Sequence, residues 1–101
     1  MQQIKIAVIG SINMDLVTQS VHFPNVGETL LGTSFHQCMG GKGANQAVAA
    51  ARFGATVQLI GAVGKDAFGC EILASLQREQ VNVAAVKIIE NTPTGIANFT
   101  K

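Results

Sequence analysis

Residues 40–51 read Gly40-Gly41-Lys42-Gly43-Ala44-Asn45-Gln46-Ala47-Val48-Ala49-Ala50-Ala51, a run of glycines followed at once by strong helix formers. Because glycine loses the most backbone freedom on ordering, residues 40–43 predict a tight loop, whereas residues 44–51 predict a helix that ends near Gly54. The first N–H groups of such a helix are unpaired and point toward a polar ligand over the loop. Asn45 in the first helical turn can reach the same ligand with its amide. The stretch therefore predicts a ligand-binding loop and helix, and the alternative of a surface turn before an ordinary helix stays open.

Two phosphate-binding motifs are excluded by residues within this stretch. A P-loop requires Ser or Thr after its lysine, but Gly43 follows Lys42, so the hydroxyl that would bind magnesium is missing. A dinucleotide-binding fingerprint requires a third glycine where this chain has Gln46. The loop is therefore not predicted to bind nucleotide phosphates in either of these ways.

The composition is that of one globular domain, with 101 residues, 48% hydrophobic and 13% charged side chains, and a net charge of +1. So low a charge excludes a disordered chain, and seven scattered Lys and Arg residues give no support to nucleic-acid binding. No apolar run approaches the roughly 18–20 residues of a membrane span, and residues 1–5 lack the pattern of a signal peptide. Cys38 and Cys70 lack metal-ligand spacing and are expected to be reduced thiols. We therefore expect a cytoplasmic protein with no membrane or nucleic-acid partner.

Residues 4–9 form an apolar run that suits a strand buried on both faces of a parallel sheet. Asn13 and Asp15 follow at its carboxyl end, where ligands bind in open α/β sheets. A carboxylate can accept hydrogen bonds from paired hydroxyls, while an amide both donates and accepts. The two side chains are therefore candidates for ligand binding, and the alternative that both only cap a turn is equally open.

Residues 16–23 alternate between apolar and polar side chains, and residues 30–39 resume extended character after a turn at residues 24–27. This pattern predicts a hairpin with one open face. The hairpin lies between the first strand and the glycine loop, so it is placed to cover a bound ligand as a lid. His22 and His36 lie in its polar positions and are expected to be solvated rather than catalytic.

The remaining residues follow a strand–helix–strand order. Strands are predicted at residues 56–62 and 83–89, a helix at residues 71–80, and a further extended segment from residue 96. Short connections between such elements are typical of βαβ units and predict an α/β fold with a mainly parallel sheet. The last segment stops without a turn or cap, and the sheet edges lack partners, so we expect the chain to be the front part of a larger protein.

Four motifs, in register with one another, resemble the ribokinase-like (PfkB) family of sugar and nucleoside kinases over the whole chain. They are Gly10-Ser11-Ile12-Asn13-Met14-Asp15, the turn from Pro24 to Thr29, Gly40-Gly41-Lys42-Gly43-Ala44-Asn45-Gln46-Ala47 with Gly54 and Gly64 at the family spacing, and the segment from Gly61 to Gly69. The resemblance implies that residues 1–101 are the amino-terminal portion of one ribokinase-like kinase domain, a three-layer α/β fold with a mainly parallel sheet and a small β lid. It also implies that the carboxy-terminal ATP-binding and catalytic part is absent from this chain. The lid strands implied are about residues 15–23, 30–39 and 95–101.

The activity that this resemblance implies is transfer of the γ-phosphoryl group of ATP, with Mg²⁺, to the terminal hydroxyl of a furanose, giving ribose 5-phosphate from D-ribose. A monovalent cation such as K⁺ is a further candidate cofactor, and the family implies a homodimer formed through the lid. Asp15 would hold a vicinal pair of sugar hydroxyls. The residues implied to bind the sugar are Asn13, Asp15, Gly41, Lys42, Gly43 and Asn45.

Other functions stay open at this point. Within the same family, the substrate could be another sugar such as deoxyribose or fructose, or a nucleoside. A non-catalytic sugar-binding or dimerisation module is an alternative from another class.

One family motif has no counterpart in these 101 residues. This second motif, Gly-Ala-Gly-Asp at a helix start, supplies the catalytic base and the anion hole for the moving phosphoryl group. Phosphoryl transfer depends on positioning, metal and electrostatic stabilisation. No catalytic residue and no metal ligand is therefore assigned to this chain, and the chain alone is expected to be inactive.

Overall fold

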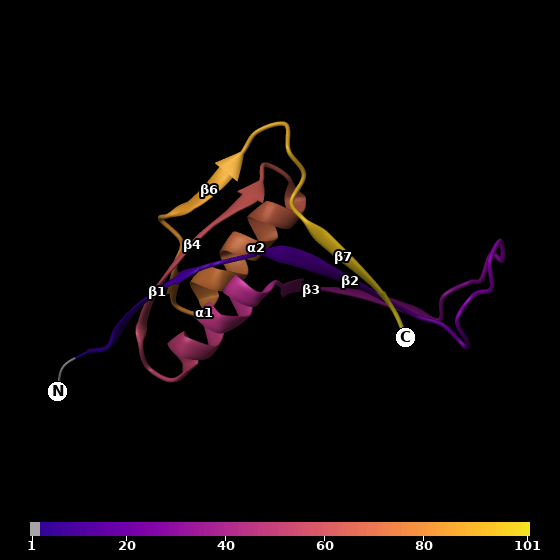
Figure 1. Ribbon diagram of the computed structural model, residues 1–101, viewed down its shortest axis with the longest axis horizontal. Helices are drawn as coiled ribbons and strands as arrows, with labels where there is room; N and C mark the ends of the chain where they lie inside the picture. Colours follow the sequence, from indigo (N-terminus) through magenta and orange to yellow (C-terminus); the bar gives the residue numbers. More distant parts are fainter. Residues whose placement is uncertain (1–2) are drawn as a thin grey trace.

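The larger part of the molecule is a parallel sheet with two helices packed on one of its faces (Figure 1). The computed structural model describes residues 3–101. Strands β1, β4 and β5 are neighbours in that order, and β6 pairs with the carboxyl half of β4. The elements of this part, which we call the body, are β1 (Lys5–Ile9), α1 (Lys42–Arg52), β4 (Thr56–Gly64), α2 (Ala67–Arg78), β5 (Val81–Asn82) and β6 (Val86–Ile89).

Both helices lie on the same face because the strand order advances in one direction. Connections between neighbouring parallel strands are right-handed, so the steps from β1 to β4 and from β4 to β5 place α1 and α2 on the same side. The two helices are joined at their ends by Arg52, whose guanidinium donates to the Glu79 carboxylate at 2.6 and 2.8 Å. The buried core includes Val8, Val57, Leu59 and Val63 of the sheet, Ala44 and Ala47 of α1, and Ile72 and Leu76 of α2.

The opposite face of this sheet is open within the described residues. Ile9 of β1 is 78% exposed. Gln58 of β4, which is the register partner of Ala7 in β1, is also exposed. The prediction that residues 4–9 are buried on both faces is therefore wrong for residues 3–101, because Val8 alone in β1 is buried. An apolar run indicates a strand of a parallel sheet, but coverage of its second face depends on elements outside the run.

The glycine loop is shorter than predicted, because α1 begins at Lys42 rather than at residue 44. Gly41 is the N-cap with a φ of 99°, and Gly43 lies inside the helix, so the prediction of a loop over residues 40–43 is wrong for its second half. At the other end, Gly54 has a φ of 98° and follows the last helical turn. This left-handed residue confirms the predicted end of the helix.

α2 also begins earlier than predicted, at Ala67 instead of residue 71. Asp66 is its N-cap, because the Asp66 carboxylate accepts a hydrogen bond from the Gly69 N–H at 2.8 Å. A side-chain oxygen in this position satisfies one of the unpaired amides of the first turn, so the helix extends back to the capping residue.

The strand predicted over residues 83–89 is divided into β5 and β6. Between the two, the Asn82 side chain accepts a hydrogen bond from the Ala84 N–H at 2.9 Å, and the Val86 N–H donates to the Val83 carbonyl at 2.9 Å. These bonds form a turn that interrupts the extended backbone. β5 and β6 then pair in parallel with successive parts of β4.

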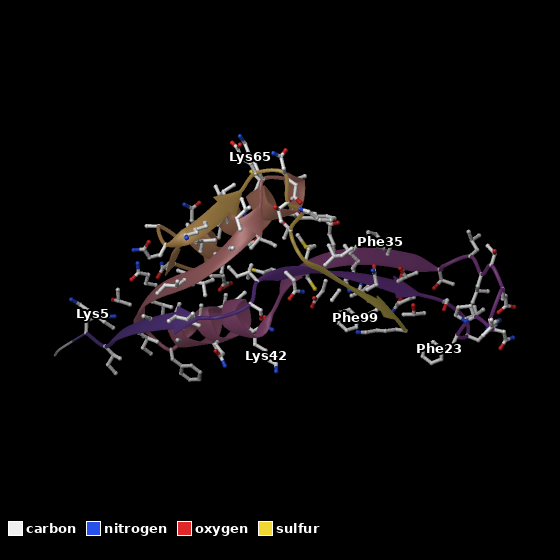
Figure 2. The ribbon with its side chains drawn as sticks, turned by 45° about the horizontal axis from the view of Figure 1, so that its top comes forward. Lys5, Phe23, Phe35, Lys42, Lys65 and Phe99 are labelled. Carbon is white, nitrogen blue, oxygen red and sulfur yellow. The ribbon has the colours of Figure 1, made fainter. Side chains whose placement is uncertain are left out.

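A second sheet projects from the body (Figures 1 and 2), and we call it the lid sheet. It consists of β2 (Asn13–Gln19), β3 (Ser34–Gly40) and β7 (Ile96–Thr100), with β2 in the middle. β3 is antiparallel to β2, whereas β7 is parallel to it. The molecule is accordingly elongated, with a longest extent of 57 Å.

The predicted hairpin is present with different bounds. Its strands pair from Asn13 with Gly40 to Gln19 with Ser34, so residues 20–33 form a long loop at the far end of the lid sheet. The pairing of β2 with β3 begins at the end of the sheet nearest the body and stops at Gln19. In the loop after Gln19, apolar side chains such as Val21 are exposed, because no described element covers them. The strands predicted over residues 16–23 and 30–39 are therefore placed too far toward the tip.

Candidate functional site

The end of β1 and the start of α1 touch each other through two glycines. A Cβ atom on Gly43 would lie 2.5 Å from the Gly10 carbonyl carbon, and a Cβ atom on Gly10 would lie 2.8 Å from the Gly43 Cα. Such distances are too short for any side chain, so both positions require glycine for packing. The first turn of α1 therefore rests directly on the carboxyl end of β1.

Ser11 satisfies two of the amides at the start of α1. Its hydroxyl accepts from the Lys42 N–H at 3.0 Å, and its carbonyl accepts from the Ala44 N–H at 3.1 Å. The prediction that the first amides of this helix are free for a ligand is therefore wrong for these two. The cap comes from Ser11, and strands β2 and β3 lie between Ser11 and the helix in the sequence. The sequence of the helix therefore carries no sign of its cap. A ligand at this junction therefore cannot use the Lys42 and Ala44 amides without displacing Ser11.

Asn13 and Asp15 lie at the start of β2, directly across from the glycine loop. The Asn13 amide donates to the Asp15 carboxylate at 2.6 Å, and both side chains are half-buried. A Cβ atom on Gly41 would lie 2.9 Å from the Asn13 Oδ1, and one on Gly40 would collide with the Asp15 carboxylate. The structure thus brings Asn13, Asp15 and Gly41 together, with Gly43 one helical position beyond Lys42.

Lys42 and Asn45 lie in the first turn of α1 with exposed side chains. Within residues 3–101 neither side chain forms a hydrogen bond, and Figure 2 shows Lys42 pointing away from the ribbon at the junction of the body and the lid sheet. In residues 3–101, no hydrogen bond joins the Lys42 or Asn45 side chain to the pair formed by Asn13 and Asp15. His22 and His36 are exposed in the lid region, as predicted.

The arrangement can bind hydroxyl groups. An ionised carboxylate has about four lone-pair positions for hydrogen bonds, and the Asn13 amide occupies one on Asp15. The Asp15 side chain is oriented by that bond and by its packing against Gly40, so the remaining positions are presented in a defined direction. Two neighbouring hydroxyls on one small molecule can occupy them.

A second polar cluster, which the sequence did not reveal, lies at the start of α2. The Asp66 carboxylate accepts from the Thr94 hydroxyl at 2.6 Å and from the Thr94 N–H at 2.8 Å, in addition to the Gly69 N–H. The Thr94 hydroxyl in turn accepts from the Gly64 N–H at 2.9 Å. These bonds, first of all the one from the Thr94 hydroxyl, hold the pKa of Asp66 below its ordinary value. An Asp before a helix signals a cap, but its partner 28 residues away leaves no local sign.

The described residues contain no cluster that could hold a metal ion, and the start of α1 has fewer free amides than the sequence predicts. No group of three His, Cys, Asp or Glu side chains in residues 3–101 is close enough to hold a metal ion. The amides at the start of α1, which offered the best place for a phosphate, are partly taken by Ser11. We therefore assign no chemical step to ATP or Mg²⁺ within these residues. In the same part of the chain, neither helix has the length and apolar character needed to cross a membrane.

Comparison with known proteins identifies relatives of this chain. Residues 3–100 match the model of a family described as pfkB family carbohydrate kinase. A ribokinase of Lactococcus lactis subsp. lactis (strain IL1403) is 53% identical over 97 residues, which cover 95% of this chain and 32% of that relative. A deoxyribokinase of Salmonella typhi is 41% identical over 92 residues, which cover 91% of this chain and 30% of that relative.

Solved structures share the fold. The structure of an Arabidopsis thaliana ribokinase complexed with ribose and ATP superposes with a TM-score of 0.86 at 32% identity, over 99% of this chain and 32% of that chain. This match confirms the predicted fold class, the amino-terminal part of a ribokinase-like α/β fold with a parallel sheet and a small lid. The chain spans about a third of the length of the relatives that it matches.

Proposed function

This chain belongs to the pfkB family of carbohydrate kinases, and we propose on that basis that the whole protein phosphorylates D-ribose at O5 with ATP. In this proposal, residues 3–101 supply the sugar-binding residues and the lid, and the phosphoryl-transfer machinery lies in the rest of the protein. The similarity to a ribokinase at 53% identity supports this activity. The chain on its own is proposed to bind sugar at most and to transfer no phosphoryl group.

The observation that carries the proposal is the orientation of the Asp15 carboxylate. It is half-buried, fixed by the Asn13 amide at 2.6 Å and packed against Gly40 at the carboxyl end of β1. A hydrogen bond to a charged group contributes about 1.5–3 kcal/mol when it is sheltered from water. A pair of ribose hydroxyls on this carboxylate would therefore provide a large share of the sugar affinity.

Other residues of the junction complete the proposed sugar site. Gly41 and Gly43 bring the backbone of the loop and of the first turn of α1 beside the pair formed by Asn13 and Asp15. Lys42 and Asn45 are exposed in that turn, so their side chains are free to turn toward a bound sugar. We assign these residues to the wall of the site that α1 provides.

The proposal also names cofactors and partners of the whole protein. ATP would supply the phosphoryl group and Mg²⁺ would neutralise its charge, with K⁺ as an activating cation, all held outside residues 3–101. Two copies would associate through their lid sheets, whose Phe35 and Phe99 are exposed in this chain. The location proposed for the protein is the cytoplasm.

The Asp15→Ala variant of the whole protein tests the proposed site. Removing the carboxylate leaves sugar hydroxyls unpaired and is expected to cost on the order of 2–4 kcal/mol of ribose binding free energy. Isothermal titration calorimetry with ribose gives this number directly. Glu90→Gln is the matched control, because Glu90 is an exposed carboxylate that pairs with the Lys65 ammonium on the surface. Ribose affinity of Asp15→Ala within about twofold of the wild type would overturn the assignment.

The relative from Salmonella typhi supports deoxyribose as the second candidate substrate. Ribose and 2-deoxyribose differ by one hydroxyl, and a site built to bond that hydroxyl rejects the sugar that lacks it. Comparing kcat/KM for the two sugars with the whole protein decides between them. A clear preference for deoxyribose would replace ribose as the substrate while keeping the kinase activity.

A further inference from the structure

The segment before β7 is pressed against the body at the end of β4. Thr94 is 3% exposed, and its hydroxyl both accepts from the Gly64 N–H and donates to the Asp66 carboxylate. A Cβ atom on Gly64 would lie 2.6 Å from the Pro93 carbonyl carbon, and one on Gly69 would lie 3.0 Å from the Thr94 hydroxyl. The backbones of these segments therefore approach as closely as glycine allows.

This attachment continues directly into the lid sheet beside the proposed sugar site. The Gly95 carbonyl, one residue after Thr94, accepts from the Met14 N–H at 2.9 Å. From there β7 pairs with β2 in parallel, with Ala97 opposite Asp15. Thr94, which contacts Asp66, is therefore only three residues before Ala97, the residue of β7 that lies opposite Asp15.

Met14 of β2 packs into the buried core of the body, but the other side-chain hydrogen bond between the body and the lid strands in the described residues is weaker. Gln37 of β3 donates to Glu71 of α2 at 2.9 Å, but both side chains are exposed. An exposed hydrogen bond competes with water and contributes little. Thr94 is buried, and its hydroxyl donates to the carboxylate of the half-buried Asp66. Hydrogen bonds to a charged group are the stronger ones.

We propose that the contact between Asp66 and Thr94 anchors β7 to the body and thereby sets the position of the lid sheet over the sugar site. The two residues are positioning residues, because neither is placed to touch a sugar at Asp15. Their effect on sugar affinity rests on the proposed function, whereas their effect on the order of β7 does not. A contact that only stabilised the fold would weaken the body and the lid sheet alike, so the two roles are separable by measurement.

The test compares Thr94→Val with Thr92→Val in the whole protein. Both changes replace a hydroxyl by a methyl group, but the Thr92 side chain is exposed and bonds only the Glu90 carbonyl at 3.3 Å. Thr94→Val leaves the Gly64 N–H and an Asp66 oxygen without their buried partner. Thr94→Ser keeps the hydroxyl and serves as the rescue variant.

The first measurement is amide hydrogen exchange, which needs no activity. In Thr94→Val we expect protection of β7 and of the Met14 N–H to fall about tenfold or more, while protection of β4 residues 57–59 stays within about twofold. Thr92→Val and Thr94→Ser should both resemble the wild type. An equal fall in β4 and β7, or no fall in β7, would overturn the proposal.

The second measurement is steady-state kinetics. We expect the KM for ribose to rise about tenfold in Thr94→Val, with the KM for ATP unchanged within about twofold. An equal rise in both KM values, or an unchanged KM for ribose beside a loosened β7, would overturn the claim that the anchor serves the sugar site. If the wild-type protein does not phosphorylate ribose, the proposed function fails, and the exchange measurement still decides the anchor.

Asp66→Asn provides a second variant if Thr94→Val does not fold. An asparagine keeps one oxygen for the α2 cap and for the Thr94 hydroxyl, now as neutral bonds. It places an NH2 group opposite the Thr94 N–H, which loses its acceptor. We expect β7 protection to fall about threefold or more, with β4 residues 57–59 within about twofold of the wild type. Protection of β7 equal to that of the wild type in this variant would also count against the anchor.

Discussion

The body and the lid sheet are stabilised in different ways, although both are built around three or more β-strands. In the body, Leu59 and Ile72 are completely buried between the sheet and the helices. In the lid sheet burial is confined largely to β2, and Phe35 on β3 is 59% exposed. Side-chain burial therefore holds the body together, whereas backbone pairing and the contacts at its base hold the lid sheet. A region with few buried contacts opens at low free energy, which suits a cover over a binding site.

Replacing one large apolar side chain in each region gives the largest expected contrast. Ile72→Ala removes a side chain that is 0% exposed, so the free energy of unfolding of the whole protein should fall by about 2–5 kcal/mol. Phe35→Ala removes a ring that is exposed in a single copy. At protein dilutions where copies do not associate, it should change this free energy by about 0.5 kcal/mol or less. Urea denaturation followed by circular dichroism measures both. Equal losses would mean that the lid sheet is covered as the body is.

The contrast between the regions also explains which parts of the fold were predictable. The alanine run of α1 and the apolar run of β1 carry local patterns, and both elements were found. The open second face of β1 and the start of α1 at Lys42 were not found. The exposure of β1 depends on whether another element covers its second face, and the start of α1 depends on the cap from Ser11. The local sequence of each element indicates neither.

Two glycines test whether the junction is as tightly packed as the body. Gly43→Ala places a Cβ atom against the backbone of Gly10, which cannot move aside, so we expect a loss of about 1–3 kcal/mol in the free energy of unfolding. Gly32→Ala in the lid region meets the Thr18 methyl group, which can rotate, and the Gln19 carbonyl at 3.2 Å. Its loss should be smaller. Thermal unfolding of both variants measures the difference, and a larger loss for Gly32→Ala would show that the junction is looser than its geometry indicates.

The sequence names Asn13 and Asp15 as candidate site residues, which stays a prediction, and it carries no sign of how their side chains are arranged. Asn13 and Asp15 are candidates because they follow the carboxyl end of a strand. The register of β2 with β3 brings the Asp15 carboxylate against Gly40, and that register depends on pairing between segments far apart in the sequence. Thr94 was missed for the same reason, since its partner Asp66 lies 28 residues earlier.

The smallest expected effect concerns the acid sensitivity of the contact between the two regions. Hydrogen bonds from Thr94 and Gly69 lower the pKa of Asp66 below its ordinary value of 3.8 in the folded protein. The unfolded chain therefore binds a proton at this carboxylate before the folded protein does. The stabilisation that Asp66 provides is complete above pH 3.8 and is lost as the pH falls from there through the lowered folded value.

Asp66→Asn isolates this contribution, because an amide does not titrate. The nearby Lys65 pairs with Glu90 at 3.3 Å on the surface, so it adds no comparable buried contact to Asp66. We expect the free energy of unfolding of the wild type to fall more steeply below pH 3.8 than that of the variant, and the two slopes to agree above it. Urea denaturation at a series of pH values between about 2.5 and 6 measures both slopes. If the free energies of unfolding of the two proteins changed in parallel over the whole pH range, Thr94 would not bind the ionised Asp66 more strongly than the protonated one. The different stability of the base and the tip of the lid sheet would then need another cause.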